Sequence, residues 1–308
     1  MDIEMLQSRI ICEAESWRAE LKMKQNNTMK IRRKKIRIPA AAGRIYIVIS
    51  LIVALFPIYW MINTSFKTEY EIYAKTPTLY PHTFTLDAYK YLLGETNFLN
   101  SMKNSLVVAA AVSLFSIMVA YPVAYTLARV KFKGRKVFSK AILFMYLLPT
   151  SVLYIPLYML LAKLHLTNSI WGLAVIYPTF TLPYISWILI PHIADISREL
   201  EEAAEVDGCT RLQTMYRIVF PLAVPGIAST AIFTFAMCWG EYLYALVNLT
   251  SVDAQTFPVV ISGLIFGDMP AWNQLMAAAV LAGIPIIIIY MLASSTLVGG
   301  RTAGGVKG

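Results

Sequence analysis

Long apolar segments alternate with short polar ones over most of the chain. There are about six such apolar segments, each near the ~20 residues that an α-helix needs to cross ~30 Å of hydrocarbon. We expect membrane-spanning helices at 44–63, 104–128, 138–162, 169–193, 222–248 and 273–298. The pattern therefore predicts an all-α, polytopic membrane protein with six transmembrane helices.

Composition agrees with this class. The chain has 308 residues, of which 57% are hydrophobic and only 15% are charged. A soluble domain of this size could not bury so much apolar surface. The first apolar segment is not expected to be a cleaved signal peptide, because it lies far from the N-terminus and ends in the bulky Tyr59 and Trp60.

Lysine and arginine gather in alternate loops. One side of the predicted membrane receives the larger group: Arg32, Arg33, Lys34, Lys35, Arg37, Arg44, Arg129, Lys131, Lys133, Arg135, Lys136, Arg198, Arg211, Arg217, Arg301 and Lys307. The positive-inside rule places both termini and the 194–221 segment in the cytoplasm of a multi-pass cell-membrane protein. The net charge of +9 is thus mostly topological, although the basic run at 30–37 could alternatively be a nucleic-acid arm. We expect membrane lipid and no nucleic acid among the partners.

We divide the chain into a basic cytoplasmic N-terminal extension at 1–43, a transmembrane domain at 44–298 and a cytoplasmic tail at 299–308. Residues 1–28 are polar and precede Met29, which begins a compact basic stretch. We expect residues 1–28 to be dispensable, so that a chain beginning at Met29 assembles and transports normally.

Helix-bending and close-packing residues occur within the apolar segments. The prolines expected to interrupt backbone hydrogen bonds are Pro122, Pro149, Pro156, Pro178, Pro183 and Pro285. Small residues near helical spacing should let the second span pack tightly: Ala109, Ser113, Ser116, Ala120 and Ala124.

The polar interruption at 194–221 has the caps of two short helices. Ser197 is a plausible N-cap of the first helix and Gly208 is its expected C′ residue. Thr210 and Gln213 have capping-box spacing for the second. Its apolar side chains are expected on one face, namely Leu212, Met215, Tyr216 and Val219. We expect Pro221 to end this second helix, leaving a knob suited to a cleft on a partner.

This knob resembles the cytoplasmic signature of the permease subunits of binding-protein-dependent ABC importers. That signature runs Glu-Ala-Ala, three residues, Gly, nine residues, Ile, one residue, Leu-Pro. The matching residues here are Glu202, Ala203, Ala204, Asp207, Gly208, Ile218 and Pro221, and Phe220 replaces the leucine. The resemblance implies that these residues contact an ATPase subunit.

Other segments are similar to the carbohydrate-importing branch of that family. They are Ser65-Phe66-Lys67, Thr85-Leu86-Asp87-Ala88-Tyr89, the stretch from Cys238 to Leu246, and the closing residues 300–308. The nearest resemblance is to the maltose-type second permease of a heterodimeric pair. It implies the type I importer permease fold, and as partners a second homologous permease, an ATP-binding cassette ATPase dimer, an extracellular solute-binding protein and an oligosaccharide or disaccharide.

The chain itself lacks the Gly-x-x-x-x-Gly-Lys-Ser/Thr phosphate cradle, so ATP hydrolysis is expected in a separate subunit. Its three cysteines and three histidines are scattered, without metal-ligand spacing. We expect a non-catalytic transport subunit with no cofactor and no metal.

Aromatic side chains in the fourth and fifth spans are candidates for the substrate pathway, because they can stack on sugar rings and form hydrogen bonds. The candidates are Tyr177, Tyr184, Trp187, Trp239 and Tyr242, together with the carboxylate of Glu241. Interfacial aromatic belts are the alternative explanation. We expect Glu241 to lie near the external interface and to face protein, a cavity or water.

Two alternatives to the importer remain. An ion-coupled secondary transporter usually has internal repeats and several intramembrane charges, whereas this chain has one such charge. A membrane enzyme is disfavoured, because no nucleophile–base or metal constellation is present.

Overall fold

The computed structural model describes residues 40–265 and 271–303, and the side chains of 43–265 and 271–294. The described residues are helical, without a β-strand among them. The chain divides into two units, residues 1–56 and 57–308. The hypothesis on residues 1–28 lies outside the described residues, as does the part of the predicted tail at 304–308.

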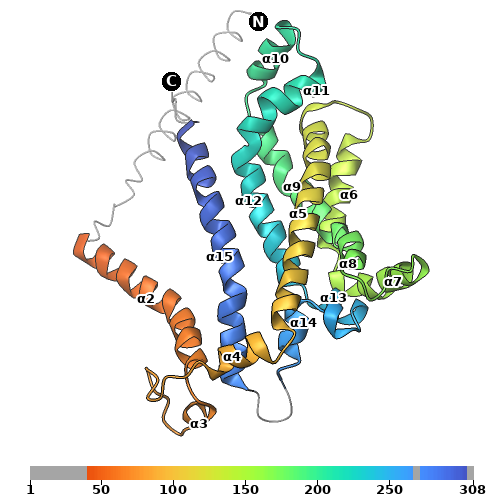
Figure 1. The fold of residues 1–308 in the computed structure, drawn as a ribbon. Helices are drawn as coiled ribbons and strands as arrows, with labels where there is room; N and C mark the ends of the chain where they lie inside the picture. The colour runs from red at the N-terminus through yellow and green to blue at the C-terminus, as the bar shows by residue number, and fades with distance from the viewer. Residues whose placement is uncertain (1–39, 266–270, 304–308) are drawn as a thin grey trace, which may run out of the picture. The chain divides into compact units, whose positions relative to one another are not determined.

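Sixteen helical elements are described in chain order (Figure 1). They are α2 (Ala40–Ser65), α3 (Glu69–Ile72), α4 (Asp87–Gly94), α5 (Phe98–Arg129), α6 (Arg135–Leu147), α7 (Thr150–Lys163), α8 (Ile170–Ile176), α9 (Pro178–Ala194), α10 (Arg198–Val206), α11 (Arg211–Thr214), the π-helix η1 (Met215–Val219), α12 (Phe220–Trp239), α13 (Leu243–Asn248), the 3₁₀-helix η2 (Val252–Ala254), α14 (Phe257–Ser262) and α15 (Trp272–Ala303).

The described part of the first unit is the beginning of α2, residues 40–56. Its side chains from Arg44 to Phe56 are exposed, although the helix is strongly apolar. Exposed apolar side chains on such a helix are the expected arrangement where lipid or another protein covers it.

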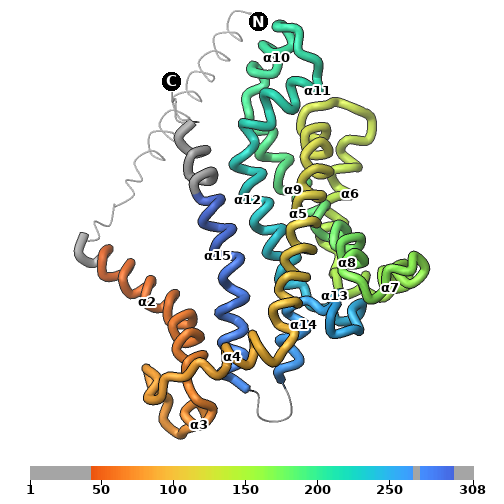
Figure 2. The backbone as a smooth tube through the Cα atoms, in the orientation of Figure 1, coloured from red at the N-terminus to blue at the C-terminus, as the bar shows by residue number. Residues whose placement is uncertain are grey.

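In the second unit, α5 packs against both α9 and α12, and α12 packs against α15 (Figures 1 and 2). The five small residues predicted to allow close packing of the second span are all buried in α5. Ser116 also forms a 2.7 Å hydroxyl–hydroxyl hydrogen bond with Thr181 of α9. The packing prediction is confirmed.

Two of the predicted spans are broken. The third consists of α6 and α7, which are bent by 94°, and the fourth of α8 and α9, bent by 41°. Four described helices are long and apolar enough to cross a membrane, or up to six spans are present if each bent pair counts as one. The single helices expected at 138–162 and 169–193 are therefore wrong. Pro149 and Pro178 stand at the two breaks, where the missing proline N–H interrupts the helical hydrogen bonds.

The fifth predicted span has different limits. Its helix runs from Arg211 through η1 to Trp239, and Gly240 ends α12 before the separate helix α13. The boundary at 248 and the helix stop at Pro221 are therefore both wrong. Pro221 lies in the first turn of α12. The helix continues through this proline because a π-turn precedes it, in which the Phe220 N–H donates to the Met215 carbonyl.

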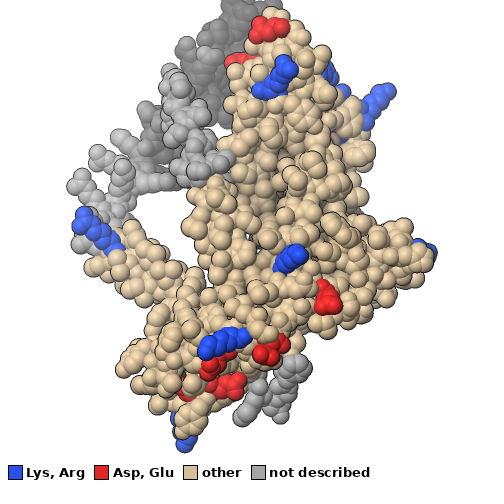
Figure 3. All heavy atoms as spheres, viewed as in Figure 1, with Lys and Arg blue, Asp and Glu red and all other residues tan. Residues whose placement is uncertain are grey.

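Charged side chains lie mainly toward the two ends of the visible face of the second unit (Figure 3). The band between them is largely uncharged, as expected for a surface that meets hydrocarbon. One charged end carries α10 and α11, which form the predicted knob.

Candidate docking site

The knob, residues 194–221, begins with a well-capped helix. The Ser197 hydroxyl oxygen accepts a 3.3 Å hydrogen bond from the Glu199 N–H, which confirms the predicted N-cap of α10. For α11, the Thr210 side chain accepts from the Gln213 N–H at 3.4 Å, and the Gln213 side chain accepts from the Thr210 N–H at 2.8 Å. These reciprocal bonds form the predicted capping box and fix the start of α11.

Gly208 joins the two helices in a left-handed conformation, with φ of +87°. The Cys209 N–H donates to the Ala204 carbonyl at 2.9 Å, and the Gly208 N–H donates to the Glu205 carbonyl at 3.1 Å. These two bonds are the Schellman termination of a helix. A Cβ at 208 would meet no heavy atom within 4 Å, so the requirement for glycine comes from the backbone angle and not from crowding.

The signature residues divide by exposure. Glu202, Ala203, Asp207, Gly208 and Pro221 are exposed, Ile218 is half-buried and Ala204 is buried. The exposed members are available to a partner.

The predicted apolar face of the second helix is divided in the same way. Met215 and Val219 are buried in the core, whereas Leu212 and Tyr216 are exposed. Half of the expected face therefore points away from the chain's own core.

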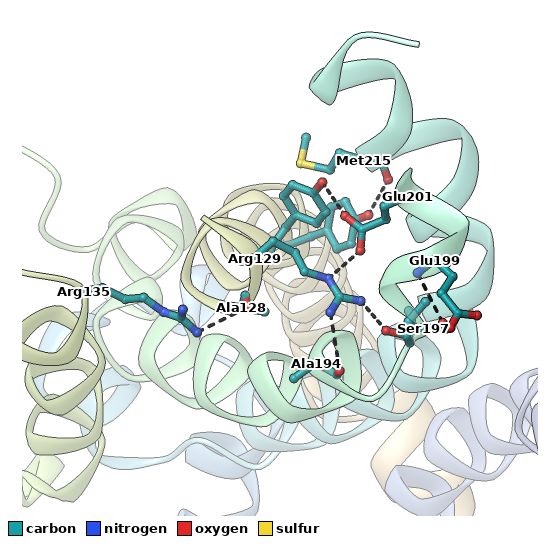
Figure 4. A network of polar contacts seen from close by, with 11 residues as sticks. Ala128, Arg129, Arg135, Ala194, Ser197, Glu199, Glu201 and Met215 are labelled. Atoms are coloured by element: carbon teal, nitrogen blue, oxygen red, sulfur yellow. Dashed lines mark hydrogen bonds and ion pairs between the residues drawn. The ribbon is translucent and has the colours of Figure 1, made fainter. Parts of the chain in front are cut away.

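A buried ion pair beneath the knob was not predicted from the sequence. The Arg129 Nε lies 2.5 Å from Glu201 Oε1, and the two side chains are only 7% and 11% exposed (Figure 4). Tyr125 donates its hydroxyl to Glu201 Oε2 at 2.9 Å, and Arg129 also donates to the Ile196 carbonyl at 2.5 Å. This network ties the end of α5 to the end of α9 and to the first turns of α10.

Neither member of that pair carries a sequence signal. Glu201 stands next to the signature residue Glu202 and belongs to an acidic run that offers several candidates for such a pair. Arg129 ends the second span among other basic residues. Only the packing of α5 against α9 brings the two charges together.

A second contact secures the π-turn. The Tyr121 hydroxyl of α5 donates to the Met215 carbonyl at 2.6 Å, and its ring packs edge-on against Phe220, with centroids 5.2 Å apart. The π-turn is therefore held by α5 from the same side as the ion pair.

The proposed pathway residues lie in different environments. Tyr177 and Trp239 are buried, and the Trp239 Nε1–H donates to the Ala282 carbonyl at 3.1 Å. Tyr184 and Tyr242 are half-buried, and Trp187 is 37% exposed. Among the six candidates, these last three rings have surface that a solute could reach in this structure, and the pathway role stays a prediction.

Glu241 has partners within the chain. Its carboxylate accepts from the Tyr177 hydroxyl at 2.7 Å and from the Tyr244 and Ala245 N–H groups at 2.8 and 3.1 Å. The expectation that Glu241 faces protein is confirmed: its carboxylate caps the first turn of α13 and links it to the end of α8. A capped carboxylate at a helix start is favourable because the first N–H groups of a helix lack partners.

Apolar helices of membrane-crossing length, with a capped two-helix knob at one charged end, define a membrane protein with an exposed polar feature beside its membrane-crossing helices. The chain belongs to the family described as the binding-protein-dependent transport system inner membrane component, which it matches over residues 113–298. The resemblance inferred from the signature residues is thereby confirmed.

Relatives of the chain are permeases of uptake systems. It is 35% identical over 263 residues to the diacetylchitobiose uptake system permease protein DasC of Streptomyces coelicolor, covering 85% of this chain and 95% of that one. It is 33% identical over 265 residues to the trehalose/maltose transport system permease protein MalG of Thermococcus litoralis, covering 85% and 94%.

The fold is similar to that in the crystal structure of a bacterial ABC transporter involved in the import of the acidic polysaccharide alginate. The TM-score is 0.69 at 22% identity, covering 86% of this chain and 98% of that one. The likeness confirms the predicted all-α ABC importer permease fold.

Proposed function

We propose that the chain is the translocating subunit of an ATP-driven importer, that its cargo is an oligosaccharide or disaccharide, and that an extracellular solute-binding protein delivers this cargo. The names of two relatives, a diacetylchitobiose uptake system permease and a trehalose/maltose transport system permease, support the substrate class. The chain contributes no catalytic step, because ATP hydrolysis takes place in a partner.

The knob docks on an ATP-binding cassette ATPase, and residues 197–220 carry the coupling. The observation that carries this proposal is the buried Arg129–Glu201 pair with its attached hydrogen bonds. It fixes α10 to the ends of two long helices, so a displacement of the knob moves those helices with it. The exposed Glu202, Asp207 and Leu212 are the side chains that meet the ATPase.

A second, homologous permease and membrane lipid cover the remaining apolar surface. Large apolar side chains of α6 and α7 are exposed in the described chain, including Phe144, Leu147 and Val152. An exposed apolar surface of this kind is unfavourable in water but ordinary against lipid or another helix.

The sugar pathway uses the accessible aromatic side chains. Tyr184 and Tyr242 offer rings to the sugar in this conformation, and Tyr177, Trp239 and Glu241 join them only when the helices around them move apart. Trp187 is left out of the proposed pathway, because it lines a basic hollow with residues of α6. The 1–43 extension, the 44–298 transmembrane domain, the 299–308 tail and the cytoplasmic placement of both termini complete the proposal.

The test is the ATPase activity of the co-expressed complex in lipid, with binding protein and a panel of sugars. We expect one class of sugar to stimulate hydrolysis, and Gly208→Val to abolish both the stimulation and the uptake. Gly208→Asn is the control, because asparagine tolerates a positive φ that costs valine about 1–2 kcal/mol. Uptake that follows a proton or sodium gradient without an ATPase would overturn the proposal.

A further inference from the structure

A basic hollow lies between α6 and α9, away from the signature residues. It has a volume of about 500 Å³ and is lined by Arg135, Lys136, Ser139, Lys140 and Leu143 of α6 and by Trp187 of α9. α6 packs along α9, so Trp187 closes the side that α6 leaves open.

The five α6 residues form one continuous face. At about 100° per residue, positions 135, 139, 143, 136 and 140 follow one another within an arc of about 140°. Three cations, a hydroxyl and a leucine therefore point into the same space, because the helical periodicity places them on one face of α6.

The charge of this hollow has no acidic counterpart nearby in the chain. No aspartate or glutamate occurs between Glu95 and Asp195. Among residues 40–265 and 271–294, the ion pair found is Arg129–Glu201, which does not involve the cations of the hollow. Arg135 donates one hydrogen bond to the Ala128 carbonyl at 3.3 Å (Figure 4) and remains charged and half-buried. The hollow therefore attracts an anion.

The length of the cationic face along α6 indicates an amphiphilic anion. The axial rise from Arg135 to Lys140 is about 7.5 Å, close to the thickness of ~5–8 Å that a headgroup layer adds on each side of the hydrocarbon. One turn further along the same face, Leu143 and the exposed Leu147 replace the cations. A small inorganic anion would contact only the cationic part of this surface and would leave the leucines without a partner.

We propose that the α6–α9 hollow is a binding site for an anionic phospholipid. The headgroup phosphate lies among Arg135, Lys136 and Lys140, the Ser139 hydroxyl donates to a phosphate oxygen, and the acyl chains follow Leu143, Leu147 and the Trp187 ring. Basic pockets between membrane helices are a recurring means of lipid recognition. This inference requires only that the chain is a membrane protein, so it stands apart from the identity of the transported sugar.

The test is native mass spectrometry of the full chain in detergent, titrated with phosphatidylglycerol. We compare wild type with Lys136→Gln/Lys140→Gln, two exposed positions at which glutamine should not disturb folding. The expected loss of lipid affinity is about 25-fold, since each lysine close to an anionic headgroup contributes about five-fold. An unchanged thermal unfolding midpoint confirms that the variant is folded.

The matched control is Lys131→Gln/Lys133→Gln, which removes the same charge from the loop directly before α6, outside this hollow. We expect the control to retain lipid within a few-fold of wild type, and phosphatidylcholine and inorganic phosphate to displace none of it. Equal losses in the two double variants would mean diffuse attraction to the loop and would overturn the site. Displacement of the lipid by inorganic phosphate would overturn the lipid assignment in favour of a small-anion site.

Discussion

Glu201 and Glu202 are neighbours in the chain and have opposite environments. Glu201 is buried against Arg129 and Tyr125, whereas Glu202 is exposed on the knob. A buried ion pair is not in itself strong evidence for stability, because desolvation offsets much of the attraction. Removing one partner is nevertheless costly, because the other charge is then left buried and unpaired.

We therefore predict that Glu201→Gln destabilises the protein by about 3 kcal/mol, since Arg129 loses its counter-charge. Glu202→Gln, the matched control, should leave stability within about 0.5 kcal/mol, as surface changes usually do, while weakening contact with the ATPase. Thermal unfolding and ATPase co-purification separate the two effects. Equal unfolding midpoints for the two variants would contradict the assigned role of Glu201.

The Tyr121 hydroxyl gives a second prediction at the scale of one residue. Tyr121→Phe keeps the ring against Phe220 but leaves the Met215 carbonyl without its hydroxyl donor. We expect a loss of about 0.5–1.5 kcal/mol, the usual net contribution of one hydrogen bond, because the Met215 carbonyl still accepts from the Phe220 N–H. Tyr216→Phe is the control, because that ring lies 6.0 Å away and is exposed. Comparable thermal midpoints for both variants would show that the hydroxyl bond does not hold the π-turn.

Among the elements, the segment after α2 shows how short-range hydrogen bonds order a loop. Glu71 of α3 accepts from the Thr78 hydroxyl at 2.5 Å and from the His82 N–H at 3.0 Å, and Lys67 donates to the Thr78 carbonyl at 2.5 Å. Burial alone would raise the pKa of Glu71, but these hydrogen bonds and the charge of Lys67 outweigh it and leave the pKa lowered.

A lowered pKa means that ionised Glu71 stabilises this loop above the ordinary glutamate pKa, and that the stabilisation is lost as the pH falls through the folded value. We predict that limited proteolysis of residues 66–86 accelerates on acidification in wild type. Glu71→Gln should cleave faster at neutral pH and lose the pH dependence. Persistence of the same pH profile in the variant would assign the effect to another group.

The proline-containing helices show that a proline alone does not decide where a span breaks. Pro122 lies inside α5 and Pro156 inside α7, yet both helices continue, whereas α6 and α7 separate at Leu148 and Pro149. Each proline removes one N–H donor and disfavours the helical conformation of the residue before it. The identity of the residue therefore does not by itself decide whether a helix continues or breaks.

At the scale of the whole molecule, the distribution of charge predicts the orientation in the membrane. We expect the knob on the cytoplasmic side and the loop after α2 on the outside. In a chain whose three cysteines are replaced by serine or alanine, Glu202→Cys should resist a membrane-impermeant maleimide in intact cells and react after lysis. Tyr70→Cys, on an exposed residue of α3, should react in both. The reverse pattern would invert the topology.

The sequence by itself determined the membrane class, the approximate positions of the apolar segments, the caps of the knob and the need for glycine at 208. These features depend on hydropathy, helical periodicity and hydrogen bonds between residues a few positions apart, all of which are written locally. It also placed the close-packing small residues of α5 correctly, because their spacing follows the helix.

Only the tertiary structure decided the 94° bend between α6 and α7, the passage of a helix through Pro221, the pairing of Arg129 with Glu201 and the hydrogen bond from Tyr177 to Glu241. The last two, like the bond from Tyr121 to the π-turn, join residues far apart in the chain. The physical reason is that burial and pairing of a polar group are properties of its surroundings in space, which no local pattern of residues specifies.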